Sequence, residues 1–131
     1  MNEVLSFENL LNQISEQTAV FIQDTLKMID SDWWNKLVIK NLSSYGRRKV
    51  EINGNKSLLE VDIHLLLKIL DVNWQEISTT KNISETNKYY TDEIPGVYSR
   101  LSNYSNEIES REDDVYRDLD LLYRFCKIIG A

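Results

Sequence analysis

The sequence predicts an all-α protein, an antiparallel four-helix bundle with one additional short helix. Three observations lead to this fold class. Apolar residues recur at helical spacing through most of the chain. The chain has only four glycines and one proline, which favours long helices over many short strands. Its 131 residues suit a single domain over 1–131, long enough to bury a core.

The first two expected helices lie in the N-terminal third of the chain. The longer one runs from about Phe7 to Ile29, with Ser6 as its N-cap. A shorter helix is expected over Asp32–Leu42, where Trp33 and Trp34 would wedge between the longer helices. The largely apolar stripe of the first helix consists of Phe7, Leu10, Leu11, Ile14, Thr18, Phe21, Ile22, Thr25, Leu26 and Ile29.

Residues 43–57 interrupt the helical pattern and predict a loop or a small hairpin. The pair Asn53-Gly54 is a turn signal, and Val50 and Ile52 alternate with charged residues as strand residues do. We therefore expect this segment to connect the short second helix to the centre of the bundle.

The most apolar stretch, Leu58 to Trp74, predicts the central helix of the bundle. Ser57 and Glu60 form a capping box at its start, and the helix is expected to end near Ile77. Its apolar arc is too wide for one exposed face, so it must be covered on more than one side. It also carries His64, the one histidine of the chain.

Two more helices are expected after a polar loop over 78–90. The first begins at Thr91 or Asp92 and continues to about Ile108, with Pro95 in its first turn, where proline is tolerated. Ser110 would cap the last helix, whose first turn is acidic, as the positive end of a helix favours. The expected seam of the last helix consists of Val115, Leu119, Leu122, Cys126 and Ile129.

The acidic composition limits the classes of function. The net charge is −6, whereas a free-standing nucleic-acid binder usually has a basic surplus. The densest basic patch is Arg47, Arg48 and Lys49, which lie beside Tyr45 and could contact phosphates. A solvated turn is the favoured interpretation of this patch, and contact with nucleic acid is the alternative.

Neither a metal nor a cofactor is expected. The acidic residues Asp113, Asp114, Asp118 and Asp120 do not share one helix face, so we interpret them as charge at a helix N-terminus. The chain has no phosphate-binding loop, dinucleotide fingerprint or zinc motif.

Sequence features also favour a cytosolic protein without membrane association. No apolar run approaches the ~20 residues of a spanning helix. The N-terminal stretch lacks a basic region before its apolar residues. The single cysteine, Cys126, cannot form an internal disulfide and is expected in the core.

Three segments together resemble a HEPN domain. The first is the central helix, in which Asp62 precedes a Leu-rich run and Asn73-Trp74 follows it. The second is a helix with an arginine before an acidic cluster. The third is the ending DDVYRDLDLLYRFCKIIGA. The closest subfamily is the one in eukaryotic transcript-quality-control endoribonucleases and at the N-terminus of bacterial helicase-type ATPases. The resemblance covers roughly Trp33 to Ala131.

The resemblance implies a degenerate ribonuclease motif. In active members an arginine and a histidine four to six residues later face a dimer cleft and cleave RNA through the ribose 2′-hydroxyl. The matching arginine is Arg100, and Ser105 and Asn106 stand at the histidine positions. Neither side chain titrates near neutrality, as moving that proton requires. Arg100, Asn103, Tyr104 and Asn106 would instead form a polar binding cleft.

The function that follows is a HEPN-like domain without ribonuclease activity, and a non-enzymatic role is therefore favoured. We expect a dimerisation, protein-interaction or regulatory module in RNA surveillance or anti-phage defence. Its partner would be a second copy or another protein, bound through the helices that carry Trp74 and Arg100. RNA is a less favoured partner.

Two alternatives stay open. One is an active, toxin-type HEPN endoribonuclease, in which Arg100 is assisted by Asn106, Tyr104 or the distant His64. The other is an antitoxin-like structural bundle that sequesters another protein. For His64, an ordinary hydrogen-bonded histidine that is partly buried or at the helix edge is favoured over catalysis.

Overall fold

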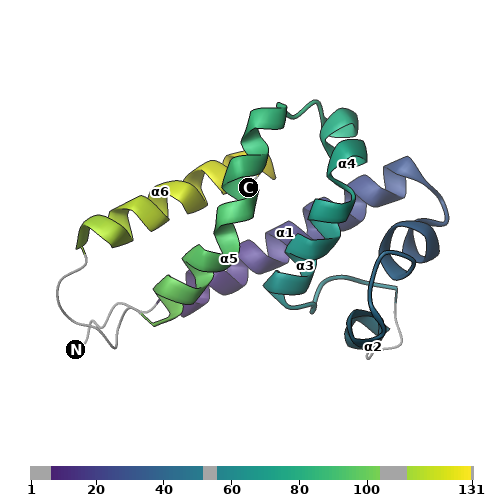
Figure 1. Ribbon diagram of the computed structural model, residues 1–131, viewed down its shortest axis with the longest axis horizontal. Coiled ribbons are helices and arrows are strands. Elements are labelled where there is room, and N and C mark those ends of the chain that lie inside the picture. The colour runs from purple at the N-terminus through teal and green to yellow at the C-terminus, as the bar shows by residue number, and fades with distance from the viewer. Residues whose placement is uncertain (1–6, 52–55, 104–111, 131) are drawn as a thin grey trace.

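The computed structural model describes residues 7–51, 56–103 and 112–130. Within these residues the chain is helical and contains no strand, which confirms the predicted all-α bundle (Figure 1). The helical segments are α1 (Glu8–Ile29), the π-helical turn η1 (Trp34–Ile39), α2 (Ser44–Glu51), α3 (Ile63–Val72), α4 (Trp74–Lys81), the 3₁₀ turn η2 (Glu85–Asn87), α5 (Lys88–Ser102) and α6 (Glu112–Ile128).

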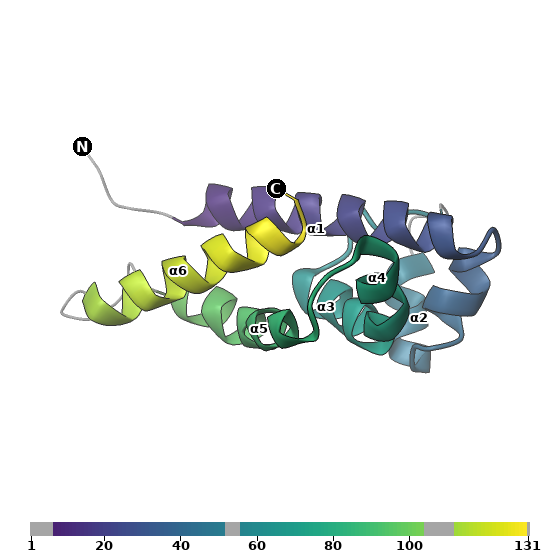
Figure 2. The same cartoon turned by 90° about the horizontal axis from the view of Figure 1, so that it is seen from above.

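The long helix α1 organises the molecule. It runs along one side, and α3, α4 and α5 lie along the other (Figure 2). Helices α3 and α4 pack against α1, whereas α6 packs chiefly against α5. The turn η1 and α2 occupy the end of the molecule that is far from α6 (Figure 1).

Helix α1 has nearly the predicted bounds because its apolar stripe faces the core. Ala19, Ile22 and Leu26 are fully buried. Thr18 and Thr25 are buried as well, and each hydroxyl donates a 2.7 Å hydrogen bond to the carbonyl one turn earlier. These bonds let two polar residues lie in the apolar stripe without unpaired groups. The predicted cap Ser6 lies outside the described residues.

The predicted loop or hairpin over 43–57 is wrong for residues 44–51, which form α2. Side-chain contacts hold this short helix in place. The Arg47 Nε donates to the carbonyls of Ile39 and Leu42, at 2.9 and 3.1 Å, and Val50 is only 2% exposed. Burial of Val50 therefore follows a helical pattern and not a strand pattern. The expected turn Asn53-Gly54 lies outside the described residues.

The predicted central helix is two helices, α3 and α4, which meet at Asn73. The Asn73 Nδ2 donates to the carbonyls of Leu37 and Ile69, at 2.8 and 2.9 Å. Helix α3 begins at Ile63, and its cap is Asp62, which accepts from the backbone N–H of Leu65, so the predicted capping box is wrong. The wide apolar arc is buried as expected, since Leu66, Ile69 and Leu70 are at most 1% exposed.

The expected polar loop over 78–90 is mostly helical. Helix α4 continues to Lys81, Asn82 ends it in the left-handed region at φ 57°, and α5 already begins at Lys88. The Lys88 amine bridges Asp71 and Asp92, which joins the start of α5 to the end of α3. Because α5 starts early, Pro95 lies inside the helix and not in its first turn.

The seam of α6 is rotated from the predicted one. Leu122 and Ile129 are buried as expected, but Asp118, Leu121 and Phe125 are buried beside them. Three predicted seam residues are only partly buried, namely Val115, Leu119 and Cys126. Helix α6 therefore turns a carboxylate toward the core, and Ser110, its predicted cap, lies outside the described residues.

All three tryptophans belong to the core, as the sequence predicts. Trp33, Trp34 and Trp74 are 8%, 6% and 4% exposed. An interface through the helices that carry Trp74 and Arg100 stays a prediction, and the buried Trp74 side chain itself is already covered within one chain. Among the helices that the structure describes, none has the length and apolar character needed to cross a membrane.

Candidate functional site

Arg100 lies in the last turn of α5 and binds Asp118 of α6 with a two-pronged ion pair. Its Nε lies 2.9 Å from Oδ2 and 3.1 Å from Oδ1, and its Nη2 lies 2.8 Å from Oδ1. The Asp118 side chain is 2% exposed, whereas that of Arg100 is 45% exposed. The hydrogen bond with Asp118 raises the pKa of Arg100 above its ordinary value. The pair joins two helices by the fork geometry that arginine and carboxylate favour.

Gly96 makes room for this arginine, one turn earlier on α5. A Cβ atom at Gly96 would lie 3.1 Å from the Arg100 Nη1, which is closer than ordinary van der Waals contact. The guanidinium therefore lies against the surface of its own helix while it reaches α6. Asp118, Arg100 and Gly96 form one structural unit between α5 and α6.

Of the other predicted motif residues the structure describes only Asn103, and no described hydrogen bond joins its side chain to the Arg100 side chain. Asn103 follows the end of α5, is exposed, and its Nδ2 donates to the carbonyl of Ser99 at 2.9 Å. Tyr104, Ser105 and Asn106 lie outside the described residues. Of the predicted binding set, the structure thus places Arg100 and Asn103, and each has a partner elsewhere.

His64 lies on a different helix from Arg100. It occupies the first turn of α3 and is exposed, so of the two predicted positions, partly buried or at the helix edge, partial burial is not observed. The described hydrogen bonds of Arg100 all go to Asp118. Among the described hydrogen bonds, none joins Arg100 to the His64 imidazole.

The basic patch of α2 is divided among different contacts. Arg47 is bound to backbone carbonyls and so takes part in the fold. Lys49 lies with its Nζ 5.5 Å from the centre of the Tyr45 ring, a cation–π contact, and Arg48 is exposed. The patch lies on a helix and not on the expected solvated turn. Contact of Arg48 and Lys49 with phosphates stays a prediction.

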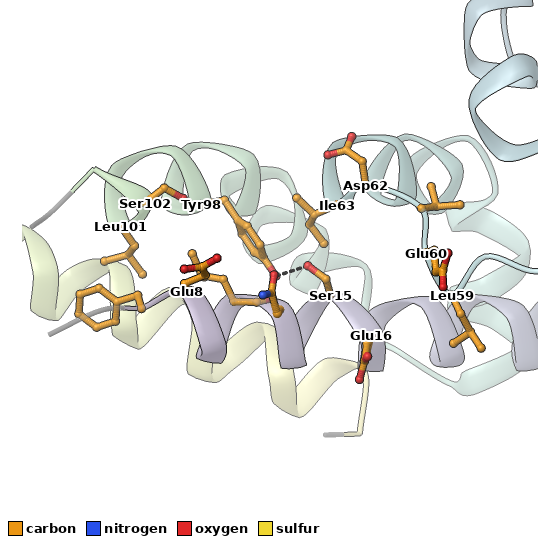
Figure 3. A pocket seen from close by; sticks show the side chains of 14 residues that line it. Glu8, Ser15, Glu16, Leu59, Glu60, Asp62, Ile63, Tyr98, Leu101 and Ser102 are labelled. Carbon is orange, nitrogen blue, oxygen red and sulfur yellow. Dashed lines mark hydrogen bonds between the residues drawn. The ribbon is translucent and has the colours of Figure 1, made fainter. Parts of the chain in front are cut away.

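A hollow of about 780 Å³ lies between α1, the segment before α3, and α5 (Figure 3). Tyr98 crosses it from α5 toward α1 and donates a 2.8 Å hydrogen bond to the carbonyl of Leu11. Because that bond uses its proton, the 2.9 Å contact with Ser15 has the serine hydroxyl as donor. Burial raises the pKa of Tyr98 to about 12. Tyr98 therefore fixes the floor of the hollow as a neutral phenol.

Carboxylates surround this hollow, which we call the acidic hollow. Glu8, Glu16, Glu60 and Asp62 are among the residues that line it, and none of its described lining residues is basic. Figure 3 shows these side chains around the edge, with Tyr98 between them. Their shared field favours positively charged groups and disfavours phosphates.

The acidic hollow was missed from the sequence because its residues come from three distant segments. No spacing along the chain links Glu16 to Asp62, and only Asp62 belongs to a segment that the family resemblance singled out. The acidic surplus of the whole chain was the available signal, but it does not say where acidic side chains gather. In the described residues, no group of three or more His, Cys, Asp or Glu side chains is placed to hold a metal ion.

Comparison with known proteins connects the helical arrangement to one family. The family model described as Swt1-like HEPN matches residues 9–130. The match covers both Arg100 and Asp118, and it includes α1, which the resemblance seen in the sequence did not. No curated protein and no solved structure gives a significant match.

Proposed function

This chain belongs to the Swt1-like HEPN family, and from that premise we propose that it acts by binding and does not cleave RNA. Its partner would be a second copy of the chain or another protein. RNA surveillance and anti-phage defence are the processes we propose for it, and both rest on the family alone. A cytosolic location likewise rests on the sequence.

The observation that carries the proposal is the position of Arg100. By the resemblance in the sequence, this residue stands where active family members have their arginine, yet its guanidinium is bound to the buried carboxylate of Asp118. The chain's one imidazole, His64, is exposed on α3. Proton transfer at a ribose 2′-hydroxyl needs a group that titrates near neutrality beside the arginine. A structural role for Arg100 explains its contacts without such a partner.

Electrostatics support a protein partner over RNA. The net charge is −6, and two hollows of about 780 Å³ are lined by carboxylates, with Lys81 as the one described basic residue of the second. RNA would be repelled by these groups, because phosphate binding depends on clustered lysine and arginine. Arg47, the first residue of the basic patch, is bound within the fold.

Two measurements on purified protein test the proposal. Light scattering over a range of concentrations gives the molar mass, and a value of twice the chain's mass supports self-association. A monomer at every concentration leaves a different protein as the partner. Incubation with structured and unstructured RNA should leave the RNA intact. Cleavage that is lost on Arg100→Ala would instead show the toxin-type ribonuclease.

A further inference from the structure

We infer that the acidic hollow is the docking site for a lysine- and arginine-rich amphipathic segment of a partner protein. The inference rests on the proposed function, because it names the kind of partner that a binding module of this shape accepts. It draws on charge, on apolar surface and on length.

Charge is the first argument. Glu16 and Asp62 are exposed at the edge of the acidic hollow, and the lining has no described basic residue. Asp62 accepts a hydrogen bond at the start of α3, which fixes its carboxylate in place. An incoming lysine or arginine would therefore meet negative charge that is already positioned.

Apolar surface is the second argument. Next to the acidic hollow lies a second hollow of about 780 Å³, which shares Glu16, Leu59 and Glu60 with it. Leu59 and Val20 both line this adjoining hollow, and they are 47% and 45% exposed. Three carboxylates, of Glu16, Asp24 and Glu60, and one amine, of Lys81, lie around these two aliphatic side chains. This arrangement matches the apolar centre and polar rim of a protein interface, with a surplus of negative charge at the rim.

The length of the two hollows is the third argument, because it favours a peptide segment over a small cation as the occupant. The two hollows together follow α1 from Glu8 to Thr25. At 1.5 Å per residue this part of α1 is about 27 Å long. A small cation would cover a fraction of that length, whereas a helical segment of about 18 residues spans it. Such a segment would present basic side chains to the edges and apolar ones to Leu59 and Val20.

A peptide titration tests the inference. The probe is a fluorescein-labelled, end-capped peptide of about 18 residues, with leucine on one helical face and lysine on the other, and binding is followed by anisotropy. The double variant Glu16→Gln/Asp62→Asn removes two charges at the acidic hollow, and asparagine retains the ability to cap α3. The matched control is Glu76→Gln/Glu85→Gln, which removes two exposed charges on α4 and η2.

The inference predicts at least about tenfold weaker binding for the hollow variant and less than about twofold for the control, and tenfold is about 1.4 kcal/mol. Leu59→Ser should weaken binding without any change in charge. Equal losses in both double variants, or no binding to the wild-type protein, would overturn the inference. An RNA-cleavage assay on the same preparations separates the two proposals, because a wild-type protein that binds no peptide and leaves RNA intact refutes the docking site alone.

Discussion

Among single residues, Arg100 has the contact with the largest expected effect on stability. In Arg100→Ala the Asp118 carboxylate stays buried without its cation, so we expect the free energy of unfolding to fall by about 2–4 kcal/mol. This loss is smaller than that expected for a fully buried ion pair, because the guanidinium is about half exposed to solvent. Asp118→Asn should cost less, because the amide needs no counter-charge. Urea denaturation of both variants measures the difference, and a loss under about 0.5 kcal/mol for Arg100→Ala would refute the structural role.

Tyr98 should make stability depend on pH in the alkaline range. Its pKa is raised from 10.0 to about 12 by burial, so the unfolded chain ionises first as the pH rises. The resulting stabilisation is complete below pH 10 and is lost between pH 10 and pH 12, by up to about 2–3 kcal/mol. Tyr98→Phe should be about 1 kcal/mol less stable at neutral pH, because it loses the bond to Leu11.

The stability difference between wild type and Tyr98→Phe should therefore shrink above pH 10 and reverse its sign before pH 12, because a loss of about 2–3 kcal/mol exceeds an advantage of about 1 kcal/mol. Denaturation curves at several alkaline pH values measure it, and taking the difference removes the titration of the other tyrosines and the lysines. A constant difference from pH 7 to pH 12 would contradict the burial of a neutral phenol.

Single residues also show what the sequence could not predict about the site. Asp118 was one of four acidic residues near a helix start, and its role depends on an arginine 18 positions away. Nothing in the local pattern separates it from Asp114 or Asp120. Arg100 was found through the family resemblance, but its partner required the packing of α6 on α5.

At the scale of helices, the ion pair between Arg100 and Asp118 joins α5 to α6, and Gly96 leaves room for the guanidinium because it has no Cβ atom. Alanine in a helix interior is normally about 0.5–1 kcal/mol more stable than glycine. In Gly96→Ala this gain should be cancelled, because the new Cβ lies 3.1 Å from the Arg100 Nη1. In the Arg100→Ala background the same substitution should recover the gain.

A double-mutant cycle on Gly96 and Arg100 measures this coupling, with an expected value of about 1 kcal/mol. Equal effects of Gly96→Ala in both backgrounds would show that the guanidinium does not lie against α5. Gly46→Ala is less suitable as a control for the general effect of replacing a helical glycine by alanine. A Cβ atom at Gly46 would itself lie close to the side chains of Leu42 and Leu65.

Helix bounds were predictable where one apolar stripe determines them and not where a distant contact does. The stripe of α1 placed that helix to within one residue. The stretch through Asn73 has continuous helical spacing, yet the helix divides there because the Asn73 amide binds the carbonyl of Leu37, 36 residues earlier. The start of α5 depends likewise on the Lys88 bridge to Asp71, which no local pattern indicates.

For the whole molecule, the fold class and the family were predictable, whereas the acidic hollow was not. The composition and helical spacing lead to an all-α bundle, and the ending of the chain led to the HEPN family that the comparison confirms. A surface built from α1, the segment before α3, and α5 appears only after the chain has folded. Its negative potential is therefore a property of the tertiary structure.

RNA cleavage tests most directly whether Arg100 has a structural role in place of a catalytic one. Wild type, Arg100→Ala and His64→Ala should be compared at a temperature where circular dichroism shows all three folded. The account predicts that all three leave RNA intact at the level of a buffer control. Cleavage by the wild-type protein that either substitution abolishes would contradict it.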